Sequence, residues 1–253
     1  MRDKEDIKYM VIPDVHGREF WREPVKNILH NTEATIVFLG DYLDPYAHEF
    51  PDAESLDDIR QKTIEIFKEI IEIKKENNKR VILLLGNHDC TYMISKEICD
   101  VRADNKNYNK IAKLFSDNKA LFQLAYEARI NKRHFIFSHA GISRVYAESC
   151  FGREVNEDNV VELFNKDFRE ENYGLIQSLG QYSMYRGYSP FDRGSLIWAD
   201  AREWELTNPK EIYGYQIVGH TQLYNPYIGK YISFLDTHDA YIINSEAEIE
   251  KYN

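Results

Sequence analysis

The sequence predicts an α/β fold. In residues 1–90, short apolar runs alternate with helical patterns in the order strand, helix, strand, helix, strand, which is typical of βαβ units and a largely parallel sheet. From about residue 128, short apolar runs follow one another with short turns between them, so we expect a more antiparallel second half. No Pro/Ser-rich linker separates the halves, and the 253 residues are 43% hydrophobic, enough for a sizeable core. We therefore expect a single domain spanning residues 1–253.

The first half contains the clearest local patterns. Residues 9–12 form a short buried strand, and "ATIVFLGDYLD" and "VILLLGNHDC" repeat the pattern of an apolar run that ends at glycine and polar residues. A first helix places Trp21, Val25, Ile28 and Leu29 on one face. The stretch from Ser55 to residue 78 has 3.6-residue periodicity and predicts a long helix, which Ser55 would cap with Asp58 in a capping box.

The second half contains a predicted hairpin and three further strands. The segment "ARINKRHFIFSHAG" predicts two strands around an Asn-Lys turn, and "YQIVGHT", "YISFLDT" and "AYIIN" predict the others. Residues 180–194 lack periodicity and are rich in Gly, Tyr, Ser and Arg. They predict a long surface loop, which is either a lid or binding loop or an ordered connection.

Composition narrows the class of protein. No apolar run reaches the roughly 18 to 20 residues of a membrane span, and the charged N-terminus lacks the apolar core of a secretory signal, so we expect a cytoplasmic location and no membrane partner. The formal charge of −10 argues against binding to a nucleic-acid backbone but does not exclude an anionic substrate held by metal ions. The three cysteines lack zinc-finger spacing and are interpreted as ordinary thiols.

Five apolar runs end in side chains that can bind metal ions. In parallel sheets such ends gather at the ligand-binding edge. Each alone has an ordinary explanation, such as a polar turn or a structural histidine, but five together predict one site. The side chains are Asp14 and His16, Asp41 with Asp44, Asn87 with His88, His139, and His220.

Carboxylate, imidazole and amide ligands without thiolates suit Mn²⁺, Fe or Zn²⁺, and we favour Mn²⁺. The number of ligands fits two ions, with Asp41 as the bridging carboxylate. Asp14 and His16 would hold the first ion, and Asn87, His139 and His220 would hold the second. Two such ions would activate a bridging water or hydroxide for attack on phosphorus.

The motifs "PDVHG", "GDYLD", "GNHD", "SHAG" and "VGHT", in this order, resemble the signature of the calcineurin-like metallophosphoesterases. The resemblance runs from residue 9 to about 244. It is greatest to the phosphoprotein phosphatase branch, which includes bacterial and phage Ser/Thr phosphatases and diadenosine tetraphosphate hydrolases. It implies a two-sheet β-sandwich flanked by helices. It also implies that His88 protonates the leaving-group oxygen and that Asp44 orients the imidazole of His88.

The sequence differs from the family pattern at two places, and the position of one family arginine is ambiguous. The branch has Arg-Gly after the second motif, where this sequence has Pro45 and Tyr46, so an arginine that grips phosphate is missing, and Arg60 or another residue would have to compensate. A second family arginine has three candidates. "LIWADAR" favours Arg202, which we prefer, "FDRG" favours Arg193, and Arg186 is the third.

His238 stands where the family usually has a small residue. It would either approach the metals or, as we favour, lie in a turn.

The resulting hypothesis is a metal-dependent phosphatase for phosphate monoesters, acting on a phosphoprotein or a small ester. The alternative enzyme cleaves a phosphoanhydride in a dinucleoside polyphosphate, for which Tyr182, Tyr185 and Tyr188 would supply a stacking surface. A catalytically silent metal-binding scaffold is the non-enzymatic alternative, and the complete set of ligands argues against it.

Overall fold

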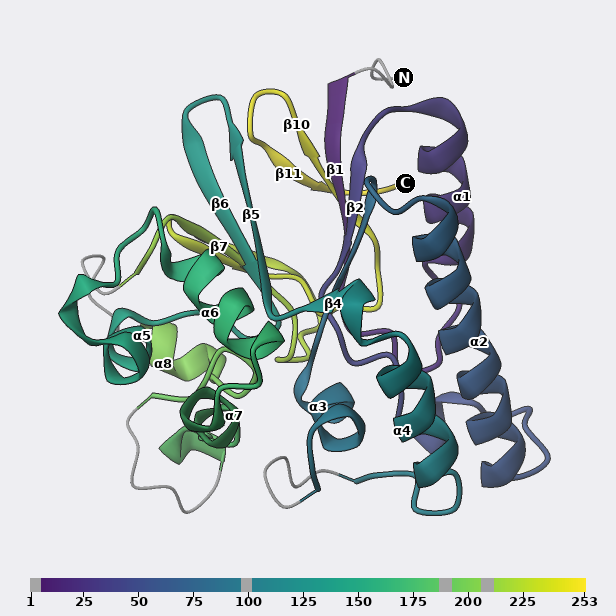
Figure 1. Cartoon of the computed structure of the whole chain (residues 1–253). Helices are drawn as coiled ribbons and strands as arrows, with labels where there is room; N and C mark the ends of the chain where they lie inside the picture. The colour runs from purple at the N-terminus through teal and green to yellow at the C-terminus, as the bar shows by residue number, and fades with distance from the viewer. Residues whose placement is uncertain (1–5, 97–101, 187–192, 206–211) are drawn as a thin grey trace. The chain divides into compact units, whose positions relative to one another are not determined.

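The computed structural model describes residues 6–96, 102–186, 193–205 and 212–253. The chain separates into two compact units. Unit 1 comprises residues 1–122 and 238–253, and unit 2 comprises residues 123–237. Two sheets, each with helices beside it, confirm the predicted mixed α/β class (Figure 1).

Unit 1 contains a six-stranded sheet in the order β11-β10-β1-β2-β3-β4. Strand β2 pairs in parallel with β1 and with β3, as predicted. Strand β10, near the end of the chain, pairs antiparallel with β1, which the sequence did not indicate. The strands are β1 (Ile7–Ile12), β2 (Thr35–Phe38), β3 (Val81–Leu84), β4 (Phe122–Gln123, on the unit boundary), β10 (Tyr241–Asn244) and β11 (Ile249–Lys251), and the helices are α1 (Arg22–Asn31), α2 (Leu56–Glu76), α3 (Asn87–Met93) and α4 (Tyr108–Asp117).

The two longest predicted helices of unit 1 form as expected. In α2, the Ser55 hydroxyl accepts a hydrogen bond from the Asp58 backbone N–H (3.2 Å), and Asn77 caps the C-terminus. Helices α1 and α2 run alongside each other (Figure 1), where Arg22 forms an ion pair with Glu69. Apolar side chains from α2, α4 and the strands are buried between these elements, so packing holds the strand ends in place.

Unit 2 contains a five-stranded sheet in the order β5-β6-β7-β9-β8. The strands are β5 (Ala125–Ile130), β6 (Arg133–Ser138), β7 (Tyr215–Val218), β8 (Tyr227–Ile228) and β9 (Ile232–Phe234), and the helices are α5 (Arg144–Phe151), α6 (Val160–Arg169), α7 (Tyr173–Leu179) and α8 (Ala201–Glu205). The predicted hairpin is β5 and β6, with Asn131 and Lys132 both at positive φ in the turn.

The expectation of a more antiparallel second half holds for β5 with β6 and β8 with β9, at the edges of this sheet, and for β10 with its two neighbours in the other sheet. Strand β7 pairs in parallel with both β6 and β9, because helices and long connections between these strands allow a crossover. Residues 187–192 of the predicted long loop lie outside the described residues, and Met184–Arg186 form a 3₁₀ turn. Within the described residues, no helix is both long enough and apolar enough to cross a membrane.

Candidate metal centre and active site

In unit 1, the loops that follow β1, β2 and β3 bring together most of the predicted site residues. The His16 backbone N–H donates to the Asp41 carbonyl (2.8 Å), which joins the first two loops. His16, Asp41 and Asp44 all have positive φ (43°, 53° and 57°), a conformation that non-glycine residues seldom adopt. Such strained conformations persist only where the surrounding structure enforces them, and they gather at functional sites.

The Asp41 carboxylate lies at the centre of this group. Its Oδ1 accepts a hydrogen bond from the His88 backbone N–H (3.0 Å), and its Oδ2 lies 3.5 Å from His16 Nε2. Gly86 makes room for it, since a Cβ at residue 86 would lie 2.1 Å from Asp41 Oδ1. The glycine that ends the β3 run is therefore required by a neighbouring carboxylate.

The His16 ring directs one of its nitrogens, Nε2, toward the Asp41 carboxylate. Its Nδ1 lies 2.6 Å from the Leu43 carbonyl oxygen, and the carbonyl can only accept, so Nδ1 carries the hydrogen. Nε2 then has a lone pair on the side of Asp41. Burial lowers the pKa of His16 to about 3, because it outweighs the opposing charge of Asp41, so the ring is neutral at ordinary pH. A neutral imidazole held through its other nitrogen is the usual form of a metal ligand.

One ligand atom from each of His16, Asp41 and His88 lies within 4.8 Å of the others, close enough for these three to share a metal ion. Asp14 and Asn87 are also buried, Asp14 directly after β1 and Asn87 at the first position of α3. The five residues supply carboxylate, imidazole and amide donors and no thiolate, so they fit the hard to borderline ions expected from the sequence.

His88 and Asp44 form the predicted pair. The distance from His88 Nδ1 to Asp44 Oδ2 is 2.8 Å, so the imidazole donates through Nδ1 and leaves Nε2 available. The Tyr92 hydroxyl donates a short hydrogen bond to Asp44 Oδ1. Burial and the charge of Asp44 raise the pKa of Tyr92, which keeps the phenol protonated as a donor. Sequence reasoning missed Tyr92, although it lies one helical turn after His88 in α3.

Asp89 is a second residue whose role the sequence did not reveal. Its fully buried carboxylate accepts hydrogen bonds from the backbone N–H groups of Asp41 (2.6 Å), Tyr42 (3.1 Å) and Gly86 (2.9 Å). Burial and the charge of Asp41 raise the pKa of Asp89. Asp89 thus fixes the β2 and β3 loops together, and its place in "GNHD" was the available signal.

In unit 2, the ends of β6 and β7 bring His139 and His220 together. The Gly219 N–H donates to the His139 carbonyl (2.9 Å), and His139 Nε2 lies 3.0 Å from His220 Nδ1. His220 has a positive φ of 63°. Two imidazole nitrogens in contact either share one hydrogen or direct both lone pairs toward one ion, so the pair fits a metal site.

The three candidate arginines differ in their contacts within unit 2. Arg202 pairs with Asp200 (2.7 Å from Nε to Oδ1), and its side chain is 57% exposed. Arg186 lies 3.2 Å from the same carboxylate and donates to the Thr221 hydroxyl (2.9 Å), next to His220 in the chain. The Arg193 carbonyl accepts from the Gln181 side chain (2.8 Å).

The remaining predicted positions are His238 and the three tyrosines of the proposed stacking surface. His238 lies in a bend with φ 63°, and its Nε2 is 4.0 Å from Glu49, in keeping with the predicted turn. The proposed tyrosine stacking surface is only partly described, because Tyr188 lies outside the described residues. The ring of Tyr182 meets Trp198 edge-on, and the Arg202 guanidinium lies over the ring of Tyr185.

Comparison with known proteins places these features in context. The family model described as calcineurin-like phosphoesterase matches residues 7–224. A cold-active protein-tyrosine phosphatase from a psychrophilic Shewanella species has a TM-score of 0.55 and 15% identity, with 98% of this chain and 81% of that chain covered. A Saccharomyces cerevisiae protein serine/threonine phosphatase has a TM-score of 0.51 and 13% identity, with 98% and 80% covered. The comparison with curated proteins gave no match.

Proposed function

This chain belongs to the calcineurin-like phosphoesterase family and is a phosphoric ester hydrolase, and we propose that it hydrolyses phosphate monoesters at a centre of two divalent metal ions. One observation carries the proposal. His16 and His88 both use Nδ1 for a hydrogen bond to an oxygen acceptor, at 2.6 and 2.8 Å, so Nε2 is the nitrogen that each has available. The family match runs through both compact units, which supports treating residues 1–253 as one domain.

The proposed metal ligands are the residues that the sequence analysis predicts. Asp14 and His16 would hold one ion, and the Asp41 carboxylate would be shared with the second. Asn87, His139 and His220 complete the second set, supported by the 3.0 Å contact between the two histidines. When bound, such ions supply an activated water and stabilise negative charge on a phosphoryl oxygen. Mn²⁺ is the first ion to test, because the donor set contains no sulfur ligand.

The chain's own groups supply the proton. We assign His88 as the general acid that protonates the leaving oxygen through Nε2, while Asp44 holds its Nδ1–H. Tyr92 keeps the Asp44 carboxylate in place from the other oxygen. For binding of the phosphate group, the hydrogen bond from Arg186 to Thr221 supports Arg186, rather than Arg202, which the sequence favours, as the cation that acts beside His220.

The proposal is tested with purified protein. Chelation should abolish hydrolysis of p-nitrophenyl phosphate, and Mn²⁺ should restore it, whereas Asp41→Asn should be inactive with and without added metal. Parallel assays on a phosphopeptide and on diadenosine tetraphosphate distinguish monoester from anhydride hydrolysis. Cleavage of the dinucleotide with no release of phosphate from either monoester would refute the monoesterase assignment in favour of the alternative. Metal binding without turnover of any of the three would favour the silent scaffold.

A further inference from the structure

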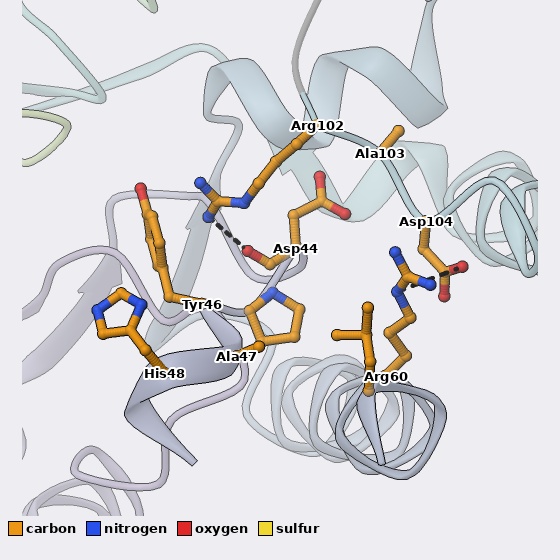
Figure 2. A pocket seen from close by; sticks show the side chains of 10 residues that line it. Asp44, Tyr46, Ala47, His48, Arg60, Arg102, Ala103 and Asp104 are labelled. Carbon is orange, nitrogen blue, oxygen red and sulfur yellow. Dashed lines mark hydrogen bonds and ion pairs between the residues drawn. The ribbon is translucent and has the colours of Figure 1, made fainter. Parts of the chain in front are cut away.

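A pocket in unit 1 lies directly beside Asp44. It has a volume of about 460 Å³, and its lining combines apolar residues, such as Pro45 and Leu56, with ionisable ones. The ionisable residues are Asp44, His48, Arg60, Arg102 and Asp104 (Figure 2). Pro45 and Tyr46, the two residues that replace the family's Arg-Gly, both line it. The two positions that differ from the family pattern therefore both lie in the wall of this pocket.

Arg102 lies against the same two-residue replacement. One of its terminal nitrogens donates to the Asp44 carbonyl (2.7 Å), and its guanidinium carbon is 3.4 Å from the centre of the Tyr46 ring (Figure 2). The Tyr46 ring also meets the ring of His16, one of the proposed metal ligands, edge-on, with the ring centres 5.2 Å apart. A glycine at residue 46 would offer no ring on which a guanidinium could stack.

The other cations near this pocket are already neutralised. Arg18 forms a two-bond contact with the Glu49 carboxylate (2.7 and 2.9 Å), and its side chain is almost buried. Arg60 lies 3.7 Å from Asp104. Among the described residues, Arg102 has no carboxylate partner, and it is exposed. Its guanidinium has five N–H donors, and the bond to Asp44 occupies only one of them.

We propose that Arg102 replaces the arginine missing at Pro45 and holds a phosphoryl oxygen of the substrate, while the adjoining pocket receives the alcohol part of the ester. This inference rests on the proposed phosphatase function. The cation thus comes from the connection between α3 and α4 instead of from the β2 loop, and Tyr46 is the platform that makes this possible. The substrate class is a phosphate monoester whose alcohol part is large enough to occupy this pocket of mixed polar and apolar lining.

The first experiment compares Arg102→Gln with the natural protein and with Arg129→Gln, a matched control in which an exposed arginine of unit 2 loses its ion pair with Asp158. Losing a charge-assisted hydrogen bond should raise KM, and the Ki of inorganic phosphate as a competitive inhibitor, by about 10- to 100-fold. Metal content should stay unchanged, and Arg129→Gln should match the natural protein. An unchanged phosphate Ki in Arg102→Gln overturns the assignment.

A second pair of variants separates the anion contact from the pocket. Leu56→Trp fills the pocket from α2, so it should raise KM for phosphotyrosine peptide and leave the phosphate Ki unchanged. Pro45→Arg should restore phosphate inhibition in the Arg102→Gln background and change it less than about threefold in the natural protein. If Pro45→Arg lowers the phosphate Ki by the same factor in both backgrounds, Arg102 does not take the place of the missing arginine.

Failure of this inference is distinguishable from failure of the proposed function. If the natural protein shows no metal-dependent turnover of p-nitrophenyl phosphate, the proposed function fails and the inference fails with it. If turnover is present and Arg102→Gln behaves as the natural protein does, only the inference fails. Should Arg102→Gln not fold, Arg102→Lys decides, because it keeps the charge and loses the planar fork. Its phosphate Ki should rise severalfold, and an unchanged Ki overturns the assignment.

Discussion

Replacing His88 with asparagine tests the assignment of the general acid. The change removes the imidazole and its 2.8 Å contact with Asp44 but keeps the backbone N–H that donates to Asp41 (3.0 Å), so the metal ligands should stay in place. A positioned proton donor is worth about 10² to 10⁴ in rate. We expect a loss of this size on phenyl phosphate or an alkyl phosphate, whose leaving group needs a proton, and a much smaller loss on p-nitrophenyl phosphate.

The assay measures kcat for these substrates together with metal content. Asp44→Asn should give the same dependence on leaving group with a loss of about 10- to 100-fold, since it removes one charge-assisted hydrogen bond. Tyr92→Phe is the matched control, because it keeps the Asp44 charge and removes a neutral donor to it, together with the acceptor of the Asp104 backbone N–H (2.6 Å), and it should cost about fivefold. If His88→Asn instead loses an ion and is equally impaired on every substrate, His88 is a metal ligand, a role that its proximity to His16 and Asp41 also permits.

Three further predictions follow from the geometry. Asp41→Asn should lower metal content more than any other single ligand change, as measured by elemental analysis, because a bridging carboxylate serves both ions; retention of two ions would contradict the bridge. Gly86→Ala should impair metal binding without unfolding the protein, because the added Cβ would lie 2.1 Å from Asp41 Oδ1; normal metal content would show that the loop can adjust. Burial alone would raise the pKa of Asp200, but the contacts with Arg202 and Arg186 outweigh it and lower this pKa from the ordinary 3.8. Asp200→Asn should therefore be less stable than the natural protein in urea unfolding from pH 5 to 7, and the difference should shrink as the pH falls below 3.8. A difference in stability that grows on acidification would refute this.

The sequence predicted β1, β2, β3, α1 and α2, because each carries a strong local pattern, whereas α3, which carries Asn87 and His88, was not predicted. The periodicity of α2 and its Ser55 cap are properties of neighbouring residues, and both were found. The pairing of β10 with β1 was not predictable, since nothing local in "AYIIN" identifies a partner more than 200 residues away. The parallel pairing of β7 with β6 and β9 was missed because the apolar pattern of a strand identifies neither its partners nor their direction.

The site shows the same division. The candidate metal-binding side chains were identifiable because each one follows the end of an apolar run. Asp89, Tyr92 and Arg102 were missed because their roles depend on contacts across loops, such as the three backbone N–H groups that converge on Asp89. The sequence located the missing arginine at Pro45 and offered Arg60 or another residue as its substitute, but it did not indicate Arg102, because the stacking of Arg102 on Tyr46 is a tertiary contact.

A metal titration of chelated protein, followed by phosphate release from p-nitrophenyl phosphate, tests the central claim most directly. We predict that the metal-free protein is inactive, and that activity rises with added Mn²⁺ and reaches a plateau at two ions per chain. A plateau at one ion, or turnover that persists in the metal-free protein, would contradict a dinuclear centre built on Asp41.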